Sequence, residues 1–182
     1  NSVLKALRLQ SPVGRLESYS QEGEDMVLRR LVADKRTGFY VDVGAHHPTL
    51  YSNTYYFYLR DWNGINIEAD PTLIEEFGKV RPRDINLSVG VGKNRNGLTF
   101  NVFNERALNT FDTEIAAERE AIKGYFIEKK INIPVVPLGD ILSEYLPSNQ
   151  EIDFLSVDTE GFDLEVLASN DWTRYRPAFI LV

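Results

Sequence analysis

Cysteine is absent from the 182-residue sequence, and only two histidines and one methionine occur. Without cysteine the chain can form neither disulfide bonds nor thiolate metal sites. Basic residues are also few, since 20 lysines and arginines stand against 27 aspartates and glutamates, for a net charge of −7. Because nucleic-acid binding needs a basic face that neutralises phosphates, we expect no nucleic-acid partner. Lys79, Arg81 and Arg83 form a local basic group, but three charges in one turn are more often simply solvated.

Long apolar runs are absent as well, and none approaches the ~18 residues that a membrane span needs. The first ten residues contain Lys5 and Arg8 without a continuous apolar stretch, which argues against a signal peptide. We therefore expect a cytoplasmic protein with no membrane span. The length suits one domain with its own core. We place this domain at residues 18–182, behind an N-terminal extension at residues 1–17, and the lack of an initiating Met indicates that further residues precede it.

Short apolar runs alternate along the chain with segments of helical spacing. Strands are expected at 39–43, 64–68, 84–89, 98–103 (half-exposed), 133–136, 152–157 and 178–182, and helices at 20–31 (capped by Ser20), 71–77 (opened by Pro71), 115–130, 139–145 and 162–168. This alternation predicts an α/β fold with a mostly parallel sheet and helices on both faces. Ligands bind such sheets beyond the carboxyl ends of the strands, so the residues that follow each strand are the candidates for a site.

Asp42 and Gly44 end the first strand and begin a loop. A glycine there lets the backbone approach a ligand closely. The loop does not match the dinucleotide fingerprint G-x-G-x-x-G, because residue 42 is acidic and Pro48 stands where a later glycine would be. An acid suits a ligand with a positive group, such as the sulfonium and ammonium of S-adenosylmethionine, better than it suits a pyrophosphate. The alternative is a tight turn in which Asp42 caps backbone amides.

Glu68 and Asp158 follow two further strands of the expected sheet. Nucleotide-binding α/β domains place a carboxylate like Glu68 on the ribose hydroxyls, although a solvated acid at a strand end is the alternative. Asp158 enters a turn that Gly161 helps to close, where it could position an acceptor hydroxyl or take its proton. Its alternative role is to cap the helix that follows.

His46 and His47, the two histidines, are adjacent in the first loop. Histidine titrates near neutral pH and is the commonest general base. The alternative is that one imidazole hydrogen-bonds the loop and the other faces solvent. A metal site with Asp158 and Glu160 is a further reading, but adjacent histidines lack the spacing of a chelating pair, and we expect no metal.

Several motifs in a fixed order carry a resemblance to a known family. They are Ser20 to Asp25, Phe39 to Pro48, Ser52-Asn53-Thr54, Trp62 to Pro71, and Asp153 to Leu167. Together they resemble the FkbM-type methyltransferases over about residues 18 to 182. The resemblance implies a Rossmann-like class I methyltransferase fold, S-adenosylmethionine as cofactor, and a hydroxyl of a sugar or other small or secondary-metabolite acceptor as the methylated group.

The resemblance also implies site residues, taken position by position. The cofactor-binding set comprises Asp42, Gly44 and Ala45 at the methionine end, Glu68 with Ala69 at the ribose, and Ser88 and Val89 near the adenine. Asp158 is placed beside the transferring methyl group. We expect His46 or His47 to be the general base and Asp158 to orient the acceptor, with Asp158 as base in the alternative assignment.

The sequence departs from the family at two places. Pro48 replaces the last glycine of the commonest form of the loop, although the His-His-Pro form also resembles a family variant. The sequence ends inside the strand after Pro177, whereas the family fold has further strands, so we expect the C-terminal strands to be missing, with a minimal version of the fold as the alternative. Two other functions compete with a methyltransferase. One is a catalytically silent cofactor-binding or interaction domain, and the other is a nucleotide-binding oxidoreductase, which the missing G-x-G-x-x-G disfavours.

Overall fold

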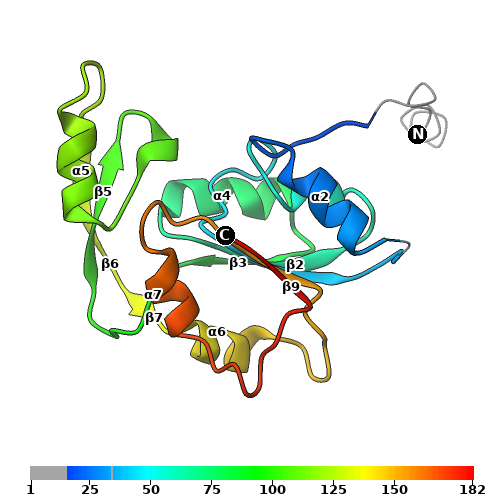
Figure 1. Ribbon diagram of the computed structural model, residues 1–182. Helices are drawn as coiled ribbons and strands as arrows, with labels where there is room; N and C mark the ends of the chain where they lie inside the picture. Colours follow the sequence, from blue (N-terminus) through cyan, green and yellow to red (C-terminus); the bar gives the residue numbers. More distant parts are fainter. Residues whose placement is uncertain (1–15, 34) are drawn as a thin grey trace.

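The structure, a computed structural model, describes residues 16–33 and 35–182 (Figure 1). The expected N-terminal extension therefore lies almost wholly outside the described residues. Five parallel strands form the main sheet in the order β3-β2-β1-β8-β9. Their bounds are β1 (Phe39–Val43), β2 (Asn63–Glu68), β3 (Ile85–Ser88), β8 (Phe154–Val157) and β9 (Phe179–Leu181). The prediction of a mostly parallel α/β sheet is confirmed, and each of these strands overlaps its predicted range.

The order of the strands creates a switch point between β1 and β8. The chain runs outward from β1 to β2 and β3, and later returns to the other side of β1 as β8 and β9. Neighbouring connections therefore leave β1 and β8 in opposite directions, which opens a crevice at their carboxyl ends.

The two faces of the main sheet differ in character, because successive side chains of a strand point to opposite faces. One face, here called the aliphatic face, carries Val41, Ile65 and Leu155, and α6 (Leu138–Tyr145) and α7 (Asp163–Ala168) pack against it. The other face, here called the polar face, carries residues that are paired in register, namely Tyr40, Asp42, Gly64, Asn66, Asn86, Phe154 and Ser156.

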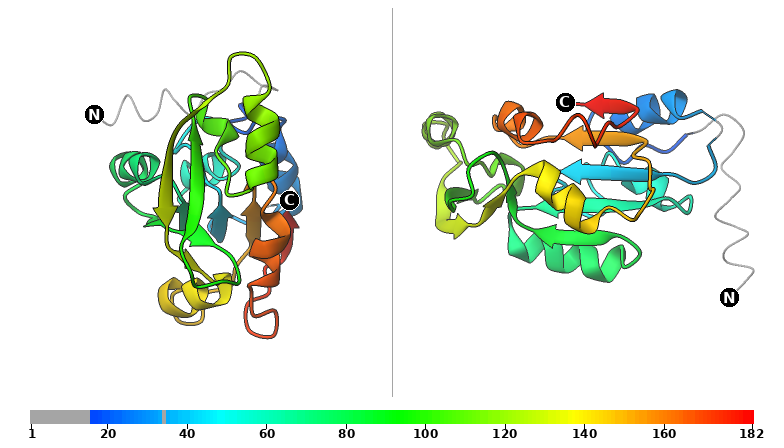
Figure 2. Two further views of the ribbon diagram at one scale, coloured as in Figure 1. Left: turned by 90° about the vertical axis from the view of Figure 1, so that its left-hand side faces the viewer. Right: turned by 90° about the horizontal axis from the view of Figure 1, so that it is seen from below.

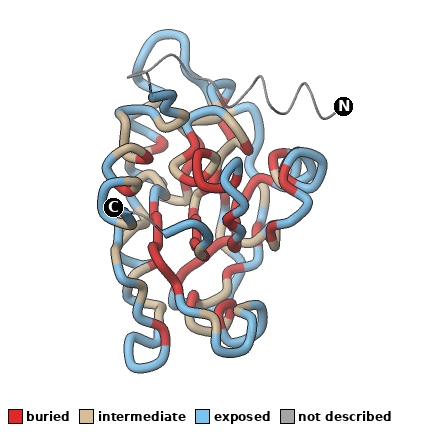
Figure 3. The backbone as a smooth tube through the Cα atoms, turned by 90° about the vertical axis from the view of Figure 1, so that its right-hand side faces the viewer, coloured by how far each residue is buried: buried red, intermediate tan, exposed pale blue. Residues whose placement is uncertain are grey.

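Three helices cover the polar face: α2 (Glu24–Leu31), α3 (Tyr55–Tyr58) and α4 (Pro71–Val80). Figure 1 shows α2 and α4 on one side of the sheet and α6 and α7 on the other. The strands run through the buried centre of the molecule between these layers (Figure 3). The prediction of helices on both faces is confirmed.

The helix starts follow local capping rules. Asp70 caps α4 by accepting a hydrogen bond from the Thr72 amide, and Pro71 occupies the first turn as predicted. The predicted cap of α2 at Ser20 is wrong, because the helix begins after Gly23. The Ser20 hydroxyl oxygen accepts from the Gly23 amide and so organises the turn that leads into the helix. Within the described part of the chain, no helix is long and apolar enough to cross a membrane.

A hairpin and a helix project from the main sheet as one segment, residues 98–133, here called the hairpin segment. It contains β5 (Leu98–Phe103), η1 (Arg106–Leu108), α5 (Thr113–Glu120) and β6 (Ile127–Ile133), and β5 pairs with β6 antiparallel. The segment lies beyond the ends to which the strands of the main sheet point (Figure 2, right). It leaves and rejoins the core through two short strands, β4 (Gly90–Val91) and β7 (Val135–Val136), which pair in parallel.

Two predictions for this segment are wrong. The helix expected at 115–130 ends at Glu120, because Gly124 turns the chain with φ +104° and β6 then pairs with β5. The β5 strand is not half-exposed, since all its residues from Phe100 to Phe103 are buried. Both differences come from the pairing between β5 and β6, which local periodicity does not reveal.

Candidate functional site

A pocket opens at the carboxyl ends of β1, β2 and β8, at the switch point of the sheet. Of the residues predicted for the site, those that line it are Asp42, Gly44, Ala45, His46, Glu68, Ala69, Val89 and Asp158. Ser88 and His47 do not line it. Ser88 is exposed at the end of β3, where it pairs in register with Glu68. The structure thus gathers the strand-end residues at one place, as the parallel sheet predicts.

Gly44 brings the backbones of two loops into contact. Its φ is +77°, and a Cβ atom at this position would collide with the carbonyl oxygen of Asp158. The Gly44 and Ala45 amides donate to the Ile67 carbonyl at 2.9 and 3.1 Å. No residue with a side chain can therefore hold the loop after β1 this close to the ends of both β2 and β8.

Asp42 is buried under the pocket floor, with 4% of its surface exposed. Its Oδ2 atom accepts a hydrogen bond of 2.7 Å from the Thr54 hydroxyl. Burial raises the pKa of the Asp42 carboxyl, while the hydrogen bonds of Thr54 and Ser156 and the charge of Arg81 act in the opposite direction. The hydroxyl contact places Asp42 in a side-chain network rather than in the backbone cap considered as its alternative.

Glu68 is fixed at the end of β2 by backbone amides. Its Oε2 atom accepts from the His46 amide at 2.9 Å, and its Oε1 atom accepts from the Asp70 amide at 2.8 Å. Burial raises the pKa of the Glu68 carboxyl to about 7, although these amide donors lower it. The carboxylate has more acceptor sites than the neighbouring backbone amides occupy, so it can also accept hydroxyl donors such as those of a vicinal diol.

Asp158 stands on the loop that follows β8. Desolvation and the charges of Glu160, Asp163, Asp42 and Glu24 raise the pKa of its carboxyl to about 6. The helix α7 that follows has Phe162 at its N-cap and no side-chain cap hydrogen bond, so Asp158 does not take the capping role that was its alternative. Asp163 Oδ1 accepts from the Thr159 amide at 2.8 Å and so holds the loop. Asp158 is thus available to a ligand in the pocket.

The hairpin segment clamps the same loop. The Thr110 hydroxyl donates to the Glu160 carbonyl at 2.9 Å, and Arg119 forms an ion pair with the Glu160 side chain. Glu160 has φ +53° and Gly161 has φ +99°. The loop therefore takes its shape from a segment some fifty positions away along the chain, as the contact of Thr110 with Glu160 shows.

The two histidines have different surroundings. His46 lines the pocket, has φ +53° and stacks on Tyr51, and burial lowers the pKa of its imidazole. The His47 ring lies against its own loop, because Nδ1 accepts from the Thr49 and Leu50 amides at 3.1 and 3.0 Å. Its Nε2 atom is 3.5 Å from Glu76 of α4. One imidazole thus organises the loop, and the other is accessible to a ligand.

Sequence reasoning missed most of one wall of the pocket. The hairpin segment supplies Phe100, Arg106, Ala107, Asn109 and Phe111 to the lining. Arg106 also approaches Asp70 at 3.6 Å, which ties the segment to the end of β2, and it pairs within the segment with Glu128 at 3.2 Å. No motif in the sequence marks these residues, because they reach the pocket only when the hairpin folds over the sheet.

The pocket combines negative charge with an apolar wall. Five acids line it, namely Glu24, Asp42, Glu68, Asp158 and Glu160, and they stand against Arg106 and His46. Val89, Phe100 and Phe111 give the opposite wall an apolar and aromatic surface. Such a lining suits a ligand that combines a cationic end, a diol and a flat ring. The described residues contain no group of three or more His, Asp or Glu side chains that could hold a metal ion.

The fold and the pocket together define a Rossmann-like α/β domain with its ligand site at the switch point of a parallel sheet. The sequence profile of the methyltransferase FkbM domain matches residues 42–182. The chain therefore belongs to the FkbM methyltransferase family, which confirms the resemblance found in its motifs and indicates methyltransferase activity. Comparison with curated proteins and with solved structures gives no match.

Proposed function

We propose that the protein binds S-adenosylmethionine and transfers its methyl group to a hydroxyl of a sugar or another small acceptor. One observation carries this proposal: two buried carboxylates, Asp42 and Glu68, meet at adjacent strand ends and face an apolar wall across one pocket. Glu68 supplies a hydrogen-bond acceptor for the ribose diol of this cofactor, and Asp42 supplies negative charge for its cationic methionine end.

Each part of the pocket has a role in the proposal. Glu68 accepts the ribose hydroxyls, and Asp42, Gly44 and Ala45 face the methionine end. Val89 contacts the adenine from the core side, and Phe100 and Phe111 do so from the hairpin segment. Once bound, the cofactor supplies a methyl group that its sulfonium already activates for displacement.

The protein then has to hold the acceptor and remove its proton. We assign the orientation of the acceptor hydroxyl to Asp158 and the removal of the proton to His46. Burial lowers the pKa of the His46 imidazole, so the ring is neutral near pH 7 and can accept a proton. His47 is left out of the chemistry, because its ring is engaged with the loop amides.

The cofactor assignment is tested by calorimetry with S-adenosylhomocysteine. We expect micromolar binding, on the order of −8 kcal/mol. Glu68→Ala should weaken it by about 1.5–3 kcal/mol, as the loss of a charged hydrogen-bond acceptor, and Glu68→Asp should also bind poorly because its carboxylate is drawn back from the diol. Glu75→Ala, on the exposed side of α4, is the matched control and should bind like the wild type. The absence of binding to folded wild-type protein at millimolar ligand would overturn the assignment.

A second set of variants tests the chemical step. With an acceptor found by screening hydroxyl compounds for methyl transfer, His46→Ala and Asp158→Asn should each lower turnover, by ~10²–10⁴-fold for the base. Their affinity for S-adenosylhomocysteine should remain close to that of the wild type, and His47→Ala serves as control. A severe loss with Asp158→Asn alone would move the base role to Asp158. Cofactor binding without transfer to any acceptor would favour a catalytically silent binding domain.

A further inference from the structure

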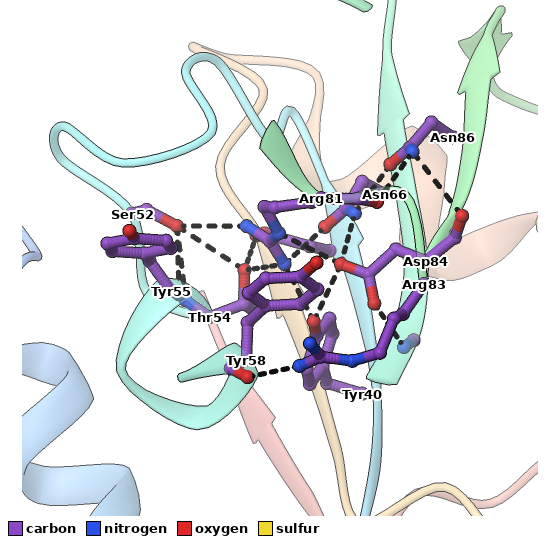
Figure 4. A network of polar contacts seen from close by, with 12 residues as sticks. Tyr40, Ser52, Thr54, Tyr55, Tyr58, Asn66, Arg81, Arg83, Asp84 and Asn86 are labelled. Carbon is purple, nitrogen blue, oxygen red and sulfur yellow. Dashed lines mark hydrogen bonds and ion pairs between the residues drawn. The ribbon is translucent and has the colours of Figure 1, made fainter. Parts of the chain in front are cut away.

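A fully buried arginine, Arg81, lies at the centre of a network of polar side chains on the polar face of the sheet (Figure 4). Arg81 follows α4, and 0% of its surface is exposed. Its Nε atom donates to Asp84 at 2.8 Å, and its Nη2 atom lies within donating distance of Tyr40 Oη, Asn66 Oδ1 and Thr54 Oγ1, at 2.8, 2.9 and 3.0 Å. The sequence expectation that Arg81 is a solvated charge is wrong, because Tyr40, Thr54 and Asn66 reach it from elements distant in the chain and Asp84, three positions along, is buried with it.

The counter-ion of Arg81 is already fully engaged. Asp84 Oδ2 accepts from Arg81, from the Tyr40 hydroxyl at 2.7 Å and from the Asn66 amide at 2.9 Å, and Oδ1 accepts from the Gly64 amide at 3.0 Å. Burying such a pair is costly, and it persists only where the remaining donors and acceptors are satisfied. Arg81 contacts Asp84 through Nε, whereas its Nη2 atom reaches Thr54.

Thr54 connects the arginine to the pocket. Its hydroxyl oxygen is 3.0 Å from Arg81 Nη2 and 2.7 Å from Asp42 Oδ2. A guanidinium has no acceptor, so it must donate to the hydroxyl oxygen. The single hydrogen of Thr54 then points to Asp42 Oδ2 at 2.7 Å, which is much closer than the other acceptor in reach, Ser52 Oγ at 3.4 Å. The contact thus presents a donor to Asp42 Oδ2 and favours the ionised carboxylate.

Asp42 needs this support, because its other surroundings disfavour its charge. It is buried, Asp84 lies near it on the polar face, and Asp158 follows the adjacent strand β8. Glu68 and Glu24 line the same pocket from β2 and α2. Against these acids stand two hydroxyls, those of Thr54 and Ser156, and one cation, Arg81.

We propose that Arg81, acting through the Thr54 hydroxyl, is a positioning residue that keeps Asp42 ionised and aimed at the cationic methionine end of the cofactor. The proposal rests on the function proposed above, because it takes Asp42 as the residue at that end. Arg81 lies below Asp42 and contacts the ligand only through this two-step relay.

The test is the pH dependence of S-adenosylhomocysteine affinity, measured by calorimetry from pH 5.5 to 9. Thr54→Val removes the hydroxyl and keeps the shape of the side chain. We expect it to move the acid limb of the affinity profile about one pH unit upward, which is a tenfold loss of affinity on that limb. Thr54→Ser keeps the hydroxyl and should restore the wild-type profile.

Two controls separate the relay from a general loss of structure. Tyr40→Phe also removes one hydroxyl that Arg81 contacts, but it leaves the path through Thr54 intact, so its profile should match the wild type. In an Asp42→Asn background, Thr54→Val should cause no further shift, because the titrating group is gone.

The outcomes divide cleanly. An unchanged profile for Thr54→Val, a shift with Thr54→Ser, or an equal shift with Tyr40→Phe would each overturn the relay. If the folded wild-type protein binds no S-adenosylhomocysteine at any pH, the proposed function itself has failed. Circular dichroism on each variant at each pH confirms that the comparison is made between folded proteins.

Discussion

The two faces of the main sheet are both buried, but by different chemistry. The aliphatic face packs Val41, Ile65 and Leu155 against α6 and α7, with contacts that have no direction. The polar face is organised by Arg81 and Asp84, whose hydrogen bonds each require one partner at one place. The acids of the proposed site extend from this second face. Directional contacts can therefore position functional groups, but they tolerate the loss of a partner far less well than apolar packing does.

The largest effect is expected from breaking the buried ion pair. Arg81→Met should lower the free energy of unfolding by about 3–5 kcal/mol, because it leaves the Asp84 carboxylate buried without its cation. Chemical denaturation measures this change. Replacing both partners, as Arg81→Met with Asp84→Leu, should cost less than Arg81→Met alone. If the double variant is less stable than Arg81→Met alone, the unpaired charge of Asp84 is not the main cause of the loss.

An intermediate effect on the free energy of unfolding is expected from the titration of Glu68. Burial raises the pKa of Glu68 to about 7 in the folded protein from an ordinary value of 4.5. Between these values the folded state holds a proton that the unfolded state has released, so stability is lost as pH rises from about 4.5 through 7. The loss attributable to Glu68 approaches about 3 kcal/mol.

Glu68→Gln isolates this contribution, because the amide does not titrate. Denaturation of the variant and the wild type from pH 4.5 to 8 should show the variant gaining relative stability as the pH rises. A constant difference across that range would mean that Glu68 ionises alike in the folded and unfolded chain. For variants of the aliphatic face, which keep Glu68, the difference in stability from the wild type should not change with pH, and this sharpens the contrast between the two faces.

The smallest effect is expected from trimming the aliphatic face. Ile65→Val removes one methylene group from a fully buried side chain in β2 and should cost about 0.5–1.5 kcal/mol. Both residues are β-branched, so the strand backbone should be unaffected. The same denaturation assay applies. A loss as large as that of Arg81→Met would remove the distinction drawn between the faces.

The aliphatic face is also the part of the fold that the sequence predicts best. Strands β1 and β8 are mostly apolar, and in β2 the apolar Ile65 and Ile67 alternate with polar residues, so the apolar positions that form this face can be read from the sequence. The β6 strand could not be predicted in this way, because its residues Ile127–Ile133 include charged side chains and its partner β5 lies about thirty positions earlier. Pairing of that range is decided by tertiary contacts, and local propensity favoured a helix instead.

The proposed site divides along a similar line. Asp42, Glu68 and Asp158 could be predicted to lie together, because the carboxyl ends of parallel strands meet at one edge. The sequence could not distinguish His46 from His47, since the difference lies in a backbone turn at His46 with φ +53°. Arg81 could not be recognised either, because the residues directly beside it are exposed and three of its partners, Tyr40, Thr54 and Asn66, are remote in the chain.

The pairing of β4 with β7 has a consequence for how the pocket can be rebuilt. Gly90 and Val91 lie beside Val135 and Val136, so the chain leaves the core and returns to it at the same point. A connection whose ends already meet changes length at low entropic cost, about 0.6 kcal/mol for each doubling. The segment between β4 and β7 can thus be exchanged as one unit, while Asp42, Glu68 and Asp158 at the strand ends stay in place. A graft from another member of the family at these junctions would carry over one complete wall of the pocket.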